Sequence, residues 1–379
     1  MKKGLAIILS LIMCLLMVVP ASADELNYDA TGLYILTESV PQEAVEHVQS
    51  SIADMLAPFY NVDSLKVGTP FKLFGTNEDI YYFVIYYDDE IIGTYRVYNA
   101  EGYYTGIFSE NPSVILGLQE IASMTSLNSP AKIVAGNYDD MYAIIDVNIY
   151  TLLSDRLGAP TQEQDLLAQP FSSVKTAVID ASEGIDFEYN QFASYTNPPS
   201  KFLNTGFAEK QNDNEWCMAY VTASIVRYKT GKSLSEVSAE KVMKWAFPSI
   251  TDTEKLKGQK LSDKKAVEFG NTYRLNPISI NGTRTYAQIA SDIQADNPVA
   301  FIGSNMNDGG ATAHAFLCRG YYDSGDYSYY SVWNPWYNKY EIIYSKDNIY
   351  TSASGNYKYK WARTVFNWAD AYRSASLDS

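Results

Sequence analysis

The chain has 379 residues and carries 44 acidic against 29 basic side chains, which gives a formal net charge of −15 at pH 7. This acidic balance argues against binding to nucleic acid, whose phosphates would repel the protein. The length is sufficient for two domains that each bury a core of their own.

The N-terminus has the composition of a secretory signal peptide. Two lysines precede an apolar run over residues 5–19, and the small residues of segment 20–23 supply a cleavage site. The run is shorter than the ~20 residues that a membrane-spanning helix needs, so an uncleaved anchor is the less favoured alternative. We therefore expect a signal peptide over residues 1–23, cleavage after Ala23, and a secreted, extracellular protein without a membrane partner.

The first half of the remaining chain predicts a small α+β domain. Residues 41–56 and 113–124 have the pattern of helices, and residues 142–149 have the pattern of a strand. Residues 80–87 and 91–98 predict two further strands, joined as a hairpin by a short acidic turn. No residue of this domain stands out as chemically active.

A linker is expected next, over about residues 189–206, where prolines, asparagines and serines replace any periodic pattern. Exposed segments of this kind are where proteases cut. We therefore expect an N-terminal domain over 24–200, a second domain over 201–379, and processing between Glu188 and Lys210.

Charge differs strongly between these two domains. Residues 24–200 hold 26 acidic and 6 basic side chains, whereas residues 201–379 hold 18 acidic and 21 basic ones. Such asymmetry suggests that an acidic prosegment is held against a mildly basic catalytic domain. The alternative is an acidic domain that contributes only solubility.

The second half predicts helices first and antiparallel strands afterwards, an α+β order. A left-handed C-cap at Gly231 should end the first helix, and Ser233 with Glu236 offers a capping box for the second. The expected helices span 216–230, 233–245, 262–269 and 286–294, and the expected strands span 299–303, 314–321 and 327–333.

Cys217 falls in the first turn of the first of these helices. Unpaired backbone amides and the helix dipole favour an anion there, so we expect a lowered thiol pKa. The alternatives are a buried structural cysteine or a disulfide with Cys318. If His314 contacts Cys217, Cys318 should lie ~13 Å further along the strand, too far for a bridge. Gln211, six residues upstream, could turn its carboxamide over the helix start and complete an oxyanion hole.

His314 opens a predicted strand after a loop rich in glycine and asparagine, and Asn334 ends another strand before Pro335. The Asn334 oxygen could accept a hydrogen bond from the imidazole and fix its tautomer, while Trp336 shields that bond from water. Alone, each residue could equally be a core histidine or a turn asparagine. His47, on the first predicted helix, is interpreted as a solvated or capping residue.

Together, the segments QNDNEWC, HAFLCRGYY and WNPW resemble the staphopain family of secreted bacterial papain-like cysteine proteases. The resemblance implies a papain-like domain of a helical part and an antiparallel sheet. It also implies that Cys217 is the nucleophile, His314 the base and acid, Asn334 the orienting residue and Gln211 the oxyanion donor. Glu215, a negative charge two residues before the nucleophile, departs from a setting that favours a thiolate.

The family is made as an inactive precursor, which fits an acidic prodomain. The expected partners are polypeptide substrates, the intramolecular prodomain and a proteinaceous inhibitor. We expect neither a cofactor nor a metal, because no set of histidines and cysteines has ligand spacing.

The sequence therefore predicts a secreted cysteine endopeptidase made as an inactive precursor. Two alternatives stay open, because fold and triad do not fix the substrate. One is a papain-like amidase or acyltransferase that acts on cell-wall peptides. The other is a secreted binding protein without enzymatic activity, which uses its tyrosine-rich first half for recognition.

Overall fold

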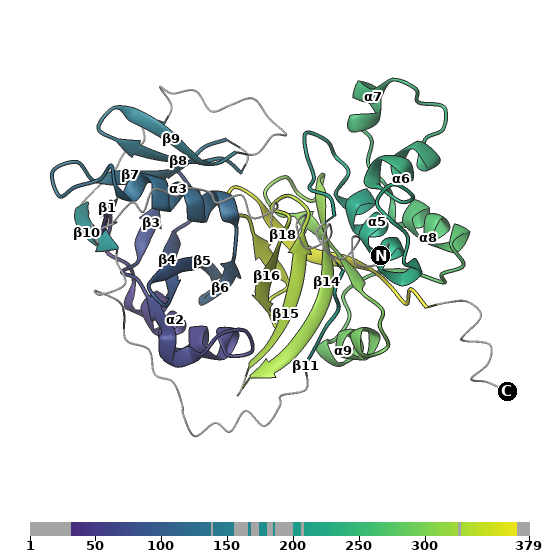
Figure 1. Cartoon of the computed structure of the whole chain (residues 1–379), viewed down its shortest axis with the longest axis horizontal. Coiled ribbons are helices and arrows are strands. Elements are labelled where there is room, and N and C mark those ends of the chain that lie inside the picture. Colours follow the sequence, from purple (N-terminus) through teal and green to yellow (C-terminus); the bar gives the residue numbers. More distant parts are fainter. Residues whose placement is uncertain are drawn as a thin grey trace, which may run out of the picture. The chain divides into compact units, whose positions relative to one another are not determined.

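The computed structural model describes residues 32–137, 139–154, 166–167, 174–179, 185, 200–205, 208–324 and 327–369 (Figure 1). The predicted signal peptide and most of the predicted linker lie outside these residues. We call the described residues up to 185 the N-terminal half and those from 200 onward the C-terminal half. Both halves belong to one compact unit that begins at Gly32.

The N-terminal half combines two helices, a short 3-10 helix (η1) and strands. Its elements are β1 (Leu33–Thr37), α2 (Gln42–Leu56), η1 (Val62–Ser64), β2 (Leu65–Val67), β3 (Phe71–Leu73), β4 (Ile80–Tyr87), β5 (Glu90–Ala100), β6 (Tyr103–Ser109), α3 (Pro112–Ala122), β7 (Ala131–Ala135), β8 (Met141–Ile145), β9 (Asn148–Leu153) and β10 (Lys175–Ile179).

The C-terminal half begins with helices and continues mostly with strands. Its elements are β11 (Ser200–Phe202), α5 (Cys217–Thr230), α6 (Ala239–Ala246), α7 (Thr253–Lys257), α8 (Asp263–Thr272), β12 (Ile278–Asn281), α9 (Tyr286–Gln294), β13 (Val299–Asn305), β14 (Ala313–Ser324), β15 (Tyr327–Asn334), β16 (Lys339–Tyr344), β17 (Ile349–Thr351) and β18 (Lys358–Phe366). The expected α+β class is confirmed.

Most predicted elements are present, and local signals explain their ends. Gly231 ends α5 with φ at 69°, in the left-handed region that glycine favours. Two predictions were wrong. The single strand expected over 142–149 is two strands, because the chain turns back at Asp146, whose φ is 54°. The helix expected from 233 begins only at Ala239, although Glu236 does bond to Ser233.

The helices α5, α6 and α8 form a layer on one face of the C-terminal strands (Figure 1). Their apolar side chains pack against alternate residues of β13, β14 and β15, such as Ala300, Leu317 and Trp333. The other face of these strands, with Phe301, Phe316 and similar residues, belongs to a second core that extends into the N-terminal half. Because alternate strand residues point to opposite faces, both faces of this sheet are buried.

The two halves share one sheet. Among the described strands its order is β12-β18-β13-β14-β15-β16-β6-β5-β4-β2, and β11, β17 and β3 pair with β14, β18 and β4 beside this path. The connection between the halves is the antiparallel pair β16 and β6, in which Glu341 lies opposite Ser109. The other described strands of the N-terminal half form a smaller sheet of order β10-β1-β7-β8-β9. Division into a prodomain and a peptidase domain stays a prediction.

None of the described helices is long and apolar enough to cross a membrane.

Candidate active site

Cys217 is the first residue of α5, as the sequence predicts. The residue before it is held firmly, since the Trp216 indole donates to the carbonyl of Leu256 at 2.9 Å and its backbone N–H donates to the side chain of Asn214 at 3.1 Å. The half-buried thiol points to the carbonyl of Ala313, with sulfur and oxygen 4.0 Å apart. Ala313 precedes His314, so the first turn of α5 faces the start of β14.

Burial dominates the electrostatics of this thiol. It raises the pKa of Cys217 to about 11, although backbone hydrogen bonds from Ala315 and Met218 lower it. The charges of Glu215 and Lys260 act in opposite directions and are smaller effects. The expectation of a lowered thiol pKa was therefore wrong for this structure: desolvation outweighs the helix N-terminus. Cys217 and Cys318 are both free thiols, so the alternative of a disulfide between them is also wrong.

His314 and Asn334 lie side by side on the paired strands β14 and β15. The imidazole Nε2 and the Asn334 Oδ1 are 3.1 Å apart, and both residues are fully buried. The same oxygen accepts the backbone N–H of Trp336 at 3.0 Å, which identifies it as the acceptor atom. Nε2 must then carry the proton in the neutral ring, and Nδ1 has the free lone pair. Burial lowers the pKa of His314 to about 3, so the ring is neutral at pH 7.

Trp336 lies against the imidazole of His314. Its ring stacks on the His314 ring, with centroids 3.8 Å apart and an interplanar angle of 27°. The Phe316 ring meets the same imidazole edge-on at 4.6 Å. The aromatic enclosure removes water from the imidazole and therefore contributes to its low pKa.

Gln211 lines the same small pocket as Trp336, and its backbone N–H donates to the carbonyl of Pro335 at 2.9 Å. Its side-chain Nε2 donates to the carbonyl of Asn214 at 2.7 Å. A carboxamide nitrogen has two hydrogens, so one remains available for a further acceptor. The side chain is held near the start of α5 by this bond.

A cavity of about 500 Å³ opens beside Cys217 and His314, and the residues that line it all belong to the C-terminal half. Met218, Leu261 and Ile302 supply apolar surface, and Lys260, Asp263 and Arg363 supply charge. Arg363 pairs with Asp263 at 3.0 Å. Such a mixture of apolar walls and a few polar groups is typical of a substrate cleft.

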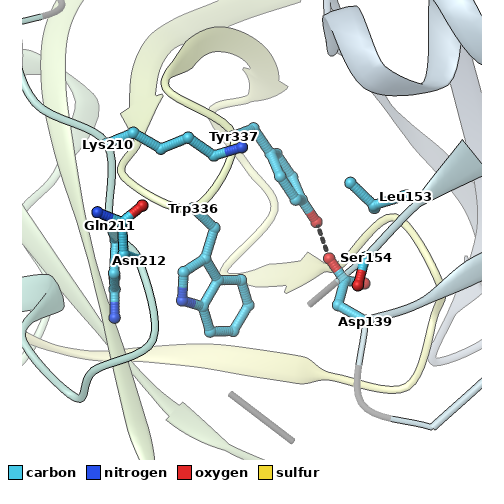
Figure 2. A pocket seen from close by; sticks show the side chains of 8 residues that line it. All are labelled: Asp139, Leu153, Ser154, Lys210, Gln211, Asn212, Trp336 and Tyr337. Carbon is cyan, nitrogen blue, oxygen red and sulfur yellow. Dashed lines mark hydrogen bonds between the residues drawn. The ribbon is translucent and has the colours of Figure 1, made fainter. Parts of the chain in front are cut away.

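The opposite side of the site is nearly filled. Figure 2 shows a pocket between Gln211, Trp336 and Tyr337 of the C-terminal half and Asp139, Leu153 and Ser154 of the N-terminal half. Its volume is only about 30 Å³, against about 500 Å³ for the open cavity. The Tyr337 hydroxyl donates to Asp139 at 2.5 Å, and the backbone N–H of Ser354 donates to the other Asp139 oxygen at 2.7 Å. The N-terminal half thus occupies the Trp336 side of the site.

Sequence reasoning missed three residues that stand behind Asn334: Arg96, Glu341 and Tyr350. The sequence gives only a weak indication that these residues belong to the site. Glu341 is a charged residue in the middle of an otherwise apolar strand segment, and Arg96 occupies a similar position in β5. A charge at such a position needs a buried partner, but the sequence does not say which one. No group of three potential metal ligands occurs among the described side chains.

The thiol at the start of α5 and the imidazole and carboxamide on adjacent strands have the arrangement expected of a papain-like cysteine peptidase. Residues 191–368 match the family model for staphopain peptidase C47, so this part of the chain is similar to that family. The family resemblance seen in the sequence is thereby confirmed.

No curated protein sequence matches the chain. One solved structure that matches comes from work on limited antibody cross-reactivity between the mite allergens Blo t 1 and Der p 1. It has a TM-score of 0.30 and 14% sequence identity, and the match covers 46% of this chain and 74% of that chain.

Proposed function

We propose that the protein is a secreted cysteine endopeptidase, made as a precursor whose N-terminal half occupies the Trp336 side of the active site. The observation that carries this proposal is the Nε2 to Oδ1 contact of 3.1 Å between His314 and Asn334, beside a cavity that Cys217 also lines. Asn334 holds the tautomer whose Nδ1 is free to act as a base, which is the requirement for activating a thiol.

In the proposed reaction, His314 Nδ1 takes the proton of the Cys217 thiol as sulfur attacks the carbonyl carbon of a peptide. The Cys217 backbone N–H and the second hydrogen of the Gln211 amide stabilise the oxyanion, at roughly 3 kcal/mol for one donor. The imidazolium then gives its proton to the leaving amine as the carbon–nitrogen bond breaks. Water, deprotonated by His314, hydrolyses the thioester and restores the thiol.

The N-terminal half supports a latent state because it fills the Trp336 side of the site, next to the His314 ring. Burial within the C-terminal half keeps the thiol protonated, and a thiol is a far poorer nucleophile than a thiolate. We therefore expect activity to appear when the chain is cut near the linker, between residues 188 and 210.

The test follows intact mass and casein hydrolysis over time for the purified secreted chain under mild reductant. Wild type should lose its acidic half as casein cleavage rises, and Cys217→Ala should do neither. Cys318→Ala is the matched control, because it removes the other free thiol of the described chain, and it should behave as wild type. Casein hydrolysis retained by Cys217→Ala would refute the proposal. If wild type stays intact and inactive, limited proteolysis of all three proteins should activate wild type and Cys318→Ala alone.

A further inference from the structure

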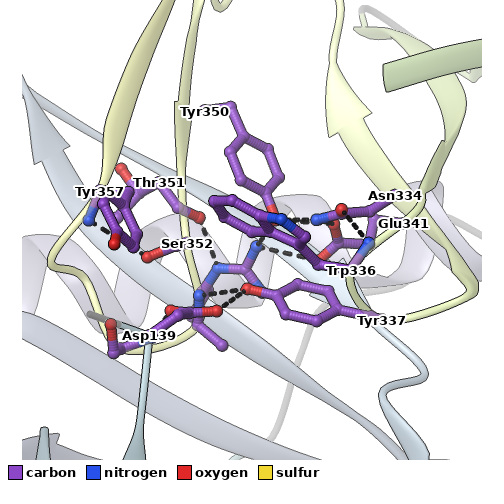
Figure 3. A network of polar contacts seen from close by, with 12 residues as sticks. Asp139, Asn334, Trp336, Tyr337, Glu341, Tyr350, Thr351, Ser352 and Tyr357 are labelled. Atoms are coloured by element: carbon purple, nitrogen blue, oxygen red, sulfur yellow. Dashed lines mark hydrogen bonds and ion pairs between the residues drawn. The ribbon is translucent and has the colours of Figure 1, made fainter. Parts of the chain in front are cut away.

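A buried polar network stands directly behind Asn334 (Figure 3). The Asn334 Nδ2 donates to the Tyr350 hydroxyl at 2.8 Å and to the Glu341 Oε2 at 3.2 Å. The Tyr350 hydroxyl in turn donates to the same Glu341 oxygen at 2.8 Å. Since the Asn334 oxygen already accepts from His314 and Trp336, every hydrogen-bonding position of this amide is used. The amide therefore cannot flip without breaking all of these bonds.

The network ends on a cation from the other half of the chain. The Arg96 guanidinium donates through Nη2 to the Glu341 Oε1 at 2.9 Å and to the Tyr350 hydroxyl at 3.1 Å. Its Nε donates to the carbonyl of Thr351 at 2.9 Å. The side chains of Arg96 and Glu341 are only 1% and 0% exposed. An ion pair this deeply buried is strongly coupled, and removing one partner leaves an uncompensated charge.

The pairing of β16 with β6 brings this cation to the site. β6 is also paired with β5, which carries Arg96, so the guanidinium reaches Glu341 across the shared sheet. Asn334, Glu341 and Tyr350 all belong to the staphopain part of the chain, and Arg96 does not. The Glu341 carboxylate thus has Arg96 as its counter-ion, and Arg96 lies in the N-terminal half that we expect to be removed.

We propose that Glu341 is a positioning residue that holds Asn334 toward His314, and that Arg96 cancels the effect of its charge on His314 while the N-terminal half is in place. The inference rests on the proposed function, because it assigns the regulation of the same site. A carboxylate two hydrogen bonds behind an imidazole favours the imidazolium, and a guanidinium beside that carboxylate opposes this effect. Removal of the N-terminal half would uncover the carboxylate and favour the imidazolium–thiolate pair.

The other side chains in contact with His314 do not supply a charge equivalent to that of Glu341 or Arg96. Cys217 lines the same cavity, and the Tyr359 ring lies 5.6 Å from the imidazole, next to the rings of Phe316 and Trp336. Burial raises the pKa of Tyr350 far above its usual value, with Glu341 adding to the effect, so Tyr350 is neutral. Asp139 also raises the pKa of Tyr350, but its carboxyl group bonds Tyr337 and Ser354. The charged groups in hydrogen-bond contact with Asn334 or Tyr350 are Glu341 and Arg96.

The test is the pH profile of Cys217 alkylation by iodoacetamide in the intact precursor, since only the thiolate reacts. Peptide mapping separates Cys217 from Cys318, and intact mass shows that the chain is uncut. Below pH 6, far under the thiol pKa, the reactive thiolate is present chiefly as its pair with the imidazolium. There Arg96→Met should raise the alkylation rate by up to about tenfold, because the carboxylate is then unopposed. Glu341→Gln should lower the rate in this pH range by a similar factor. The double variant should return close to wild type.

Opposite shifts are the result that a purely structural network would not give. Tyr98→Phe is the matched control, because the Tyr98 hydroxyl bonds the carbonyl of Ile349 across the same two halves and its loss changes no charge. Its profile should match wild type. Shifts of the same sign for Arg96→Met and Glu341→Gln, or no shift in folded proteins, would overturn the inference.

If Arg96→Met does not fold, as judged by circular dichroism, the double variant is compared with Glu341→Gln. Adding Arg96→Met there removes an uncompensated cation and should raise the alkylation rate below pH 6, and an unchanged rate would refute the inference. Failure of the proposed function has a different signature. Casein hydrolysis by Cys217→Ala would refute the peptidase mechanism but would leave the alkylation shifts intact.

Discussion

His47 should make the stability of the N-terminal half strongly dependent on pH. The residue lies in α2, where the sequence suggests a solvated or capping role, but its Nε2 is 2.8 Å from the Tyr95 hydroxyl. The two rings stack with centroids 5.9 Å apart. Burial lowers the pKa of His47 to about 4 from an ordinary value of 6.5. The folded protein therefore keeps this ring neutral at pH values where the unfolded chain protonates it.

The sign and size of the effect follow from this difference. A histidine with a lowered folded pKa binds more protons in the unfolded state, so its contribution to stability is complete above pH 6.5 and is lost as pH falls toward 4. At pH 5 the loss is about 2 kcal/mol, because one pKa unit corresponds to about 1.4 kcal/mol. That amount is a large fraction of the stability of an ordinary domain.

The assay is urea unfolding at pH 7 and pH 5 for His47→Gln and its parent, both in a Cys217→Ala background that prevents self-cleavage. Glutamine can still bond the Tyr95 hydroxyl but does not titrate. The loss of unfolding free energy between the two pH values should be about 2 kcal/mol smaller in His47→Gln.

Comparing the two proteins isolates His47 from the rest of the chain. Burial also lowers the pKa of His314, and it raises the pKa of Asp139 and Asp347, which act in the opposite direction. These groups are present in both proteins. An identical pH dependence in the two would refute the reasoning.

Two further substitutions test local features of the C-terminal half. Gly231→Ala should lower the unfolding free energy by about 1 kcal/mol, because a Cβ there meets no neighbour and only the left-handed backbone resists it; an unchanged urea midpoint would contradict this. Glu209→Gln should cost about 2 kcal/mol in the same assay, because the carboxylate that pairs with Arg227 at 2.5 Å also accepts the backbone N–H of Ala239. A cost below about 0.5 kcal/mol would mean that this ion pair behaves like a surface one.

The sequence by itself indicated many of the helices and strands and singled out the candidate reactive residues. Helix α9 and strand β4 begin and end where the local pattern predicts, because caps and periodicity act over a few residues. Cys217, His314 and Asn334 could be chosen because few other residues have the required chemistry, and because their order along the chain matches a known family. The association of His314 with Asn334 follows from the pairing of two neighbouring strands.

Only the tertiary structure decided how these residues are surrounded. The thiol pKa is raised rather than lowered because burial depends on everything that packs around the start of α5, which local sequence does not describe. The contact of Arg96 with Glu341 joins residues 245 positions apart, through a strand pairing that no local pattern indicates. Periodicity reports which face of a strand is buried, whereas the partner that covers it is set by the packing of the whole chain.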